Sequence, residues 1–237
     1  MTAESSEVQA IFERWSLYEK VIRLNYMCHQ QMIQVIQGAV EQIDGPLRVL
    51  DLGCGDGWMA SQGLKNGSLE TYHGIDLSES ALAVARQHLE PLGGSLNLHR
   101  GNFLEFLDDE FTPTPNLILA SYSLHHFSGN DLQWLLSRLR SHLSADDGLF
   151  VWIDIKCEPG ESRPEYMDRF HNQLLPTWDS LTPSQMGEVI DHMTQSDFPL
   201  EIEEQHQLAR EAGLEPEDCL YSDDYYAAHT LRRAESK

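Results

Sequence analysis

Basic residues are scarce in this chain, and their scarcity argues against one class of partner. There are 16 lysines and arginines against 38 acidic residues, which gives a formal net charge of −22. Such a field repels a polyanion, and no basic cluster longer than Arg232–Arg233 reverses it locally. We therefore expect no nucleic acid among the partners, whereas a neutral or cationic small molecule is compatible with this charge.

Cysteines and long apolar runs are also few. The four cysteines are widely separated and include no CxxC pair, a pattern typical of reduced thiols in the cytoplasm. No apolar run approaches the roughly 20 residues that cross a membrane, and the first residues lack the basic and apolar segments of a secretory signal. These absences predict a cytoplasmic protein that does not associate with membranes.

The apolar residues that are present follow a helical and then an alternating pattern. Over residues 6–40 they recur at a spacing typical of a helix, and nothing predicts a break before Gly38. Farther on, short and almost continuously apolar strands alternate with helices, which predicts a parallel sheet covered on both faces. The expected strands are residues 48–53, 71–77, 95–102, 115–123 and 146–156, and the expected helices are residues 57–65, 78–92 and 128–144.

Residues 157–199 interrupt this alternation and are too many for a simple connection. Two helices are expected there, around residues 164–175 and 183–194, each with a proline near its first turn. The remaining expected elements are a helix over residues 200–214 and two antiparallel strands over residues 217–223 and 225–233.

The stretch RVLDLGCGDGWMA, residues 48–60, indicates a ligand site. Three glycines follow Asp51 at alternate positions, between an expected strand and an expected helix. In open α/β sheets, ligands bind beyond the carboxyl ends of the strands. The loop fits a dinucleotide poorly, because Trp58 stands where G-x-G-x-x-G requires its third glycine, and no GK[ST] marks a phosphate-binding loop. A different nucleotide-like cofactor and a simple tight turn remain as interpretations.

DLGCGDG resembles the first motif of the class I S-adenosylmethionine-dependent methyltransferases. GIDLSESALAVARQHL is similar to the second strand and helix of that family, and RGNFLEF, LILASYSLHHF and GLFVWIDI resemble its next loop and its fourth and fifth strands. The resemblance implies S-adenosyl-L-methionine as cofactor, with S-adenosylhomocysteine as product. It also implies a Rossmann-like α/β fold with a seven-stranded, mostly parallel sheet, an antiparallel last strand, and helices on both faces.

One methyltransferase domain over residues 1–237 is expected from this resemblance. Its segments would be an N-terminal helical cap (1–44), a cofactor-binding core (45–156), a helical lid inserted after the fifth strand (157–199), and a closing helix with strands (200–237).

Four residues are expected around the methionine and ribose parts of the cofactor. By resemblance, Asp51, Gly53 and Gly55 would line the methionine part, with the carboxylate near its ammonium group. Asp76, at the end of the second strand, would accept bonds from both ribose hydroxyls.

Four further residues are expected around the adenine ring and the sulfonium. Asn102 stands where the family usually has an acid, and its amide oxygen can still accept from the adenine amine. Leu77 and Phe103 would enclose the ring, and Ser121 would face the sulfonium.

The acceptor is expected between LHHF, the N-terminal helix and the lid. His125 or His126 is predicted to contact it or to act as a base. Eleven histidines are present, and a metal could be bound if Asp154, His125, His126, His171 and His192 converge in one cavity. No HxH or HxxxH pair marks a metal site, so no metal is predicted, although the sequence does not settle whether these histidines bind one. The residues predicted to bind the acceptor are Tyr18, Tyr26, His29, Tyr166, His171 and Trp178.

The function that the resemblance favours is methyl transfer to O, N or S of a small molecule. SYSL occupies the place where [DN]PP[YF] is typical of enzymes that methylate amino groups of bases. An RNA or protein methyltransferase and a non-catalytic S-adenosylmethionine-binding regulatory protein are the alternatives. Neither the acceptor nor the oligomeric state can be read from the sequence, although a homodimer through the N-terminal helix is one option.

Overall fold

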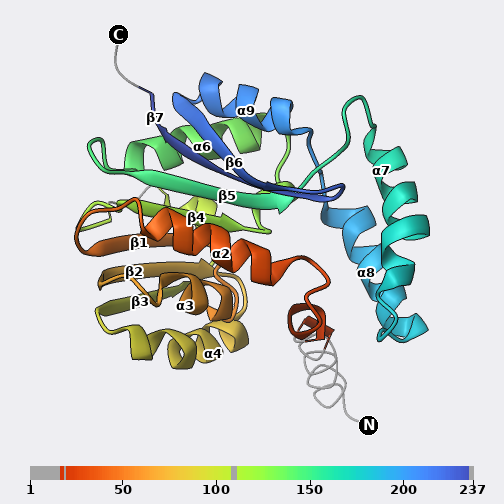
Figure 1. Ribbon diagram of the computed structural model, residues 1–237, viewed down its shortest axis with the longest axis horizontal. Coiled ribbons are helices and arrows are strands. Elements are labelled where there is room, and N and C mark those ends of the chain that lie inside the picture. Colours follow the sequence, from red (N-terminus) through yellow and green to blue (C-terminus); the bar gives the residue numbers. More distant parts are fainter. Residues whose placement is uncertain (1–16, 19, 108–110, 235–237) are drawn as a thin grey trace.

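Seven strands form one sheet in the computed structural model, which describes residues 17–18, 20–107 and 111–234. The strand order is β3-β2-β1-β4-β5-β7-β6, and every pair is parallel except the two that β7 makes. This order confirms the predicted Rossmann-like sheet with its antiparallel last strand (Figure 1). The strands are β1 (Leu47–Leu52), β2 (Leu69–Asp76), β3 (Ser95–Arg100), β4 (Leu117–Ser121), β5 (Leu149–Ile155), β6 (Leu214–Ser222) and β7 (Tyr226–Arg233).

Helices cover the sheet on both sides, because the strands carry apolar residues on both faces. In β4, Leu117 and Leu119 pack in one apolar cluster with α2, α3 and α4, whereas Ile118 and Ala120 pack in a second cluster with α6 and α9. Burying one such side chain contributes about 1.5–3 kcal/mol. The helices are α2 (His29–Val40), α3 (Trp58–Leu64), α4 (Glu79–Leu89), α5 (Phe103–Phe106), α6 (Gly129–His142), α7 (Arg163–Arg169), α8 (Pro183–Ser196) and α9 (Ile202–Glu211).

The expected unbroken helix over residues 6–40 is wrong in its described part. A helical segment ends at residue 23, a turn follows, and α2 begins at His29. Asn25 and Cys28 have left-handed backbones, with φ of 57° and 56°. The Asn25 side chain stabilises the break, because its oxygen accepts from the N–H of Gln30 at 2.8 Å. Residues 1–16 of the expected cap lie outside the described part of the chain.

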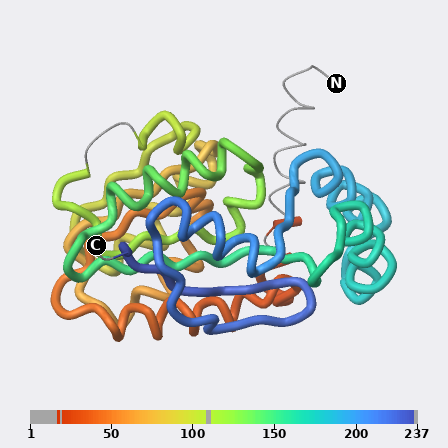
Figure 2. The backbone as a smooth tube through the Cα atoms, turned by 90° about the horizontal axis from the view of Figure 1, so that it is seen from above, coloured from red at the N-terminus to blue at the C-terminus, as the bar shows by residue number. Residues whose placement is uncertain are grey.

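The inserted segment forms the two helices that its prolines predicted. Each helix begins with a capping box, Ser162 with Glu165 in α7 and Thr182 with Gln185 in α8. Figures 1 and 2 both place α7 and α8 at one end of the molecule, beyond the end of β5. No helix in the described ranges combines the length and apolar character needed to cross a membrane.

Candidate functional site

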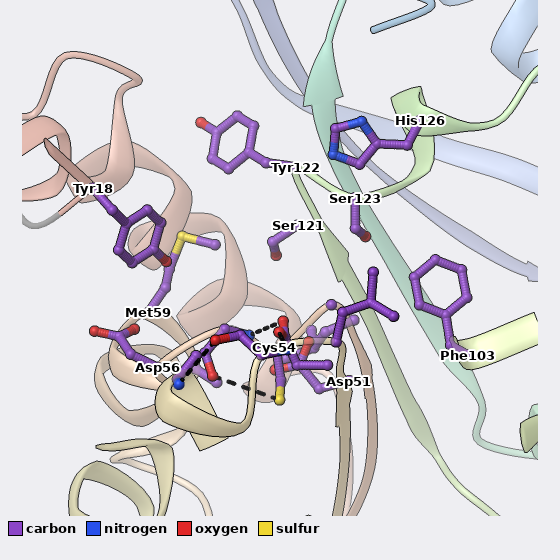
Figure 3. A pocket seen from close by; sticks show the side chains of 18 of the residues that line it. Tyr18, Asp51, Cys54, Asp56, Met59, Phe103, Ser121, Tyr122, Ser123 and His126 are labelled. Atoms are coloured by element: carbon purple, nitrogen blue, oxygen red, sulfur yellow. Dashed lines mark hydrogen bonds between the residues drawn. The ribbon is translucent and has the colours of Figure 1, made fainter. Parts of the chain in front are cut away.

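A cavity of about 940 Å³ lies beyond the carboxyl ends of β1, β2 and β4 (Figure 3). Its wall is completed by the segment before α2 and by the end of α8. The residues predicted from the sequence that line it are Tyr18, His29, Asp51, Gly53, Gly55, Asp76, Leu77, Asn102, Phe103, Ser121 and His126. Residues from the cap, the core and the lid are therefore brought together in one place.

The glycine loop forms one side of this cavity. The N–H groups of Gly53 and Cys54 both donate to the carbonyl of Ile75, at 2.8 and 3.1 Å, and so join the ends of β1 and β2. Gly53 has a φ of 71°, and a Cβ on it would lie 2.8 Å from the Cβ of Ser123. Both the backbone and the available space therefore require glycine at this position.

Asp76 connects the glycine loop to the helix after β2. One carboxylate oxygen accepts from the N–H of Gly55 at 2.8 Å, and the other accepts from the N–H of Ser78 at 2.8 Å. Ser78 caps α4, as its sequence position predicted. Because each carboxylate oxygen can accept more than one bond, Asp76 retains capacity for hydroxyl groups in the cavity.

Asp51 is a buried carboxyl group that also faces the cavity. It is 4% exposed and accepts from the hydroxyl of Tyr72. Burial raises its pKa to about 7, while the bond from Tyr72 lowers the pKa and the charge of Asp76 raises it. A cationic group placed beside Asp51 would favour the ionised carboxylate.

The residues expected at the adenine ring lie together at the start of α5 and the end of β2. The Asn102 oxygen caps α5 by accepting from the N–H of Leu104 at 3.0 Å. Phe103 is 9% exposed and packs against Phe127, with ring centroids 5.2 Å apart. Leu77, by contrast, is 71% exposed at the rim of the cavity.

The loop after β4 lies opposite the cap. Tyr122 has a left-handed backbone with a φ of 54°, and its hydroxyl donates to the carbonyl of Met27. Ser123 donates to the carbonyl of Leu52 at 2.8 Å. The loop is thus tied both to β1 and to the segment that precedes α2.

The two histidines predicted to be catalytic differ in position. His126 lines the cavity, and its Nδ1 lies 3.1 Å from the carbonyl oxygen of Ser196 in α8. His125 is buried outside the cavity wall, with its Nδ1 and its backbone N–H both on Asp154. Burial alone would lower the pKa of His125, but the carboxylates of Asp154 and Asp197 raise it above its ordinary value.

Four of the residues predicted to bind the acceptor do not line this cavity. Tyr26 stacks on Trp178, with ring centroids 5.1 Å apart, and joins the cap to the lid. Tyr166 is fully buried between Phe170 of the lid and Tyr225, the residue before β7, and His171 is exposed. Their aromatic or polar character alone did not distinguish packing from ligand contact.

Sequence reasoning also missed several residues of the wall. Asp56 lies inside the glycine motif and Tyr122 inside SYSL, so their positions were a usable signal. Phe198, at the end of the lid, carried none, because only the docking of α8 against the core places it there. His192 also lines the wall, and the sequence had indicated it as a possible ligand. The missed residues of the wall include Asp56, Met59, Tyr122, Ser123, Gln195 and Phe198.

The fold and the site together define a class of protein. An open sheet of this order with an antiparallel β7, and a cavity between a glycine loop and an acidic residue at the end of β2, is the arrangement of Rossmann-like methyltransferases. Residues 49–146 match the family model described as "Methyltransferase domain". This match and the fold are consistent with a class I S-adenosylmethionine-dependent methyltransferase family.

Solved structures share the fold over most of the chain. The plantazolicin methyltransferase BpumL, in complex with a monoazolic desmethylPZN analog and SAH, has a TM-score of 0.65 at 15% identity, and the match covers 97% of this chain and 93% of that one. An O-methyltransferase family protein from Burkholderia thailandensis has a TM-score of 0.64 at 16% identity, over 92% of this chain and 58% of its own.

A curated relative matches a short part of the sequence. The Ubiquinone biosynthesis O-methyltransferase of Aromatoleum aromaticum is 46% identical over 59 residues, which is 25% of this chain and 24% of the relative. The match thus spans about a quarter of the length of that relative.

Proposed function

We propose that this chain transfers a methyl group from S-adenosyl-L-methionine to a small-molecule acceptor. The cavity is the observation that supports this most directly, because it places Asp51, the glycine loop and Asp76 on one side and His126 on the other. Its volume of about 940 Å³ is near the upper end of the range for ligand pockets, roughly 300–1,000 Å³. A cavity of this size has room for an acceptor beside the cofactor.

The side chains around the glycine loop suit the cofactor chemically. Asp51 would pair with the ammonium group, and Asp76 would accept from the ribose hydroxyls. An adenine ring beside Phe103 would cover Leu77, which is otherwise 71% exposed. The Asn102 oxygen keeps one lone pair for the adenine amine beyond the bond from Leu104. When bound, the cofactor supplies an electrophilic methyl group on its sulfonium.

The opposite side of the cavity would hold the acceptor. It combines aromatic and polar side chains, which suits a small, partly apolar molecule with a hydroxyl, amine or thiol group. Both the curated relative and one of the structural relatives bear the name O-methyltransferase, which favours oxygen as the acceptor atom. The chain would contribute by holding the acceptor in line and excluding water. The acceptor side is formed by Tyr18, His29, Tyr122, His126, His192 and Phe198.

Titration calorimetry with S-adenosylhomocysteine tests this proposal. Asp76→Ala should raise the Kd at least tenfold, about 1.4 kcal/mol, because two hydroxyl contacts are lost. Asp76→Asn is the matched control: it keeps one acceptor oxygen and should lose less affinity. Thermal unfolding of each ligand-free variant shows whether the loop that Asp76 holds through Gly55 and Ser78 is still folded.

Turnover separates the remaining alternatives. The unmodified protein should methylate members of a panel of small phenols, amines and thiols. If S-adenosylhomocysteine does not bind at all, the methyltransferase proposal is wrong. Tight binding without turnover on that panel, or on RNA and protein acceptors, would instead support a regulatory protein.

A further inference from the structure

Asp197 lies where the lid returns to the sheet, and its carboxylate is buried. The residue follows the last turn of α8 and is 4% exposed. Its Oδ1 atom has no hydrogen-bond partner within the described part of the chain. A buried carboxylate oxygen without a hydrogen bond is costly unless a cation neutralises it. The surroundings of Asp197 therefore indicate which cation that is.

Three imidazole nitrogens surround this oxygen. His125 Nε2, His126 Nδ1 and His192 Nε2 lie 3.6, 3.4 and 3.6 Å from Asp197 Oδ1. These distances exceed the usual 2.7–3.2 Å of an N–H···O bond. They agree with the separation of neighbouring ligand atoms in a tetrahedral zinc site, about 3.3–3.6 Å for bonds of roughly 2.0–2.2 Å. A proton can bridge only one such pair, whereas one metal ion can bridge all of them.

The partner of His125 fixes which of its nitrogens faces Asp197. Its Nδ1 donates to Asp154, which leaves Nε2 as the ring nitrogen that faces Asp197, 3.6 Å from Oδ1. A histidine oriented by a carboxylate is also the usual arrangement of metal-binding histidines. Asp154 is itself fixed by bonds from Trp152 Nε1 and the N–H of Ile155, at 3.1 and 3.0 Å.

We propose that His125, His126 and Asp197 bind one divalent transition-metal ion, with His192 as the fourth ligand. One ligand atom from each of the first three lies within 4.8 Å of the others. Imidazole and carboxylate donors suit Zn²⁺ and similar ions. Coordination by His126 Nδ1 would replace its contact with the Ser196 carbonyl at 3.1 Å. Because His126 and His192 line the cavity, the ion would lie in its wall.

This inference departs from the expectation that the chain binds no metal. Two adjacent histidines and a helix-ending aspartate are not a recognisable ligand spacing, and the fold alone brings them together. The site does not depend on methyl transfer, because it is defined by its own donor atoms. Its test can therefore fail while the proposed function stands, and the reverse is also possible.

The experiment is a metal titration of the full chain, purified without a histidine tag and stripped with a chelator. Co²⁺ is the probe, because four-coordinate cobalt has an intense visible absorption that six-coordinate cobalt lacks. We expect saturation at one equivalent, with this absorption, and displacement by Zn²⁺. Less than a tenth of an equivalent bound would overturn the proposal, and so would a spectrum typical of six coordination.

Variants locate the ion. Asp197→Asn keeps the shape of the side chain and should weaken Co²⁺ binding at least tenfold. His192→Gln should also weaken it at least tenfold, and its side chain is 60% exposed, so the fold tolerates this change. The matched controls are Asp191→Asn, an exposed carboxylate on the same helix, and His171→Gln, an exposed imidazole of the lid; both should bind as the unmodified protein does. Unchanged affinity in Asp197→Asn and His192→Gln would refute the assignment.

Discussion

Asp51 illustrates how the surroundings of one residue set its charge and its function. The carboxyl group is 4% exposed near the end of β1, and burial raises its pKa to about 7. It is therefore partly protonated near neutral pH in the free protein. A bound ammonium group would favour the ionised form, so binding of such a ligand should release a proton from Asp51.

The affinity for S-adenosylhomocysteine should therefore depend on pH through Asp51. Between about pH 6 and about pH 8 the Kd should fall several-fold, because less work is needed to ionise the carboxyl group. Asp51→Asn should bind more weakly and lose most of this pH dependence. Calorimetry across this range measures both effects. If the Kd depends on pH equally in the unmodified protein and in Asp51→Asn, another group causes that dependence.

At the scale of elements, the sequence predicted regular structure well and local exceptions poorly. The strands were predictable because both faces of the sheet are covered, so that Leu117 to Ala120 are all apolar and buried. The turn before α2 was not, because left-handed backbone at Asn25 and Cys28 leaves the apolar periodicity on either side unchanged. Asparagine tolerates this conformation, which was the only local hint.

That turn brings Tyr26 against the lid, and this contact should hold the cap and the lid together. Tyr26 stacks on Trp178, and its hydroxyl donates to Asp179 at 3.2 Å and accepts from the N–H of Ser180 at 3.0 Å. Tyr26→Ala should therefore increase amide hydrogen exchange in both segments and reduce turnover, with little change in cofactor Kd.

Tyr26→Phe is the control for this prediction. It keeps the stacked ring and removes the hydroxyl bonds, so its exchange should lie between those of Tyr26→Ala and the unmodified protein. Hydrogen exchange followed by mass spectrometry resolves the two segments separately. Equal exchange in all three proteins would show that the contact of Tyr26 with Trp178 does not hold the cap and the lid together.

At the scale of the whole molecule, the cavity residues near the glycine loop were more predictable from the sequence than those on the opposite wall. Asp51 and Asp76 could be placed because each lies at the carboxyl end of a strand, and the parallel strands all end at one edge of the sheet. His126 and His192 are 66 positions apart in the sequence (192 − 126), and only the docking of α8 against the core brings them together. No local pattern encodes such a contact.

The pH dependence of the free energy of unfolding should reflect buried titratable groups that are far apart in the chain, among them His229 and Asp51. His229 in β7 is 1% exposed, and neither of its ring nitrogens has a hydrogen-bond partner among the described residues. Burial lowers its pKa from 6.5 to about 3. Its contribution to stability is therefore fully present above pH 6.5 and is lost as the pH falls toward 3, because the unfolded chain takes up a proton that the folded chain does not. At pH 5 this loss is about 2 kcal/mol.

Asp51 changes the free energy of unfolding with pH in the opposite direction to His229. The test therefore compares variants and not absolute stabilities. The raised pKa of Asp51 means that its contribution is present at acidic pH and is lost as the pH rises through about 7. His229→Leu leaves that contribution in place and removes the one from His229. Urea unfolding at pH 8 and pH 5 should therefore show that acidification costs this variant about 2 kcal/mol less than the unmodified protein. The control His171→Gln, at an exposed position, should lose as much stability between pH 8 and pH 5 as the unmodified protein does. An equal loss in His229→Leu would show that His229 does not contribute to the pH dependence of stability.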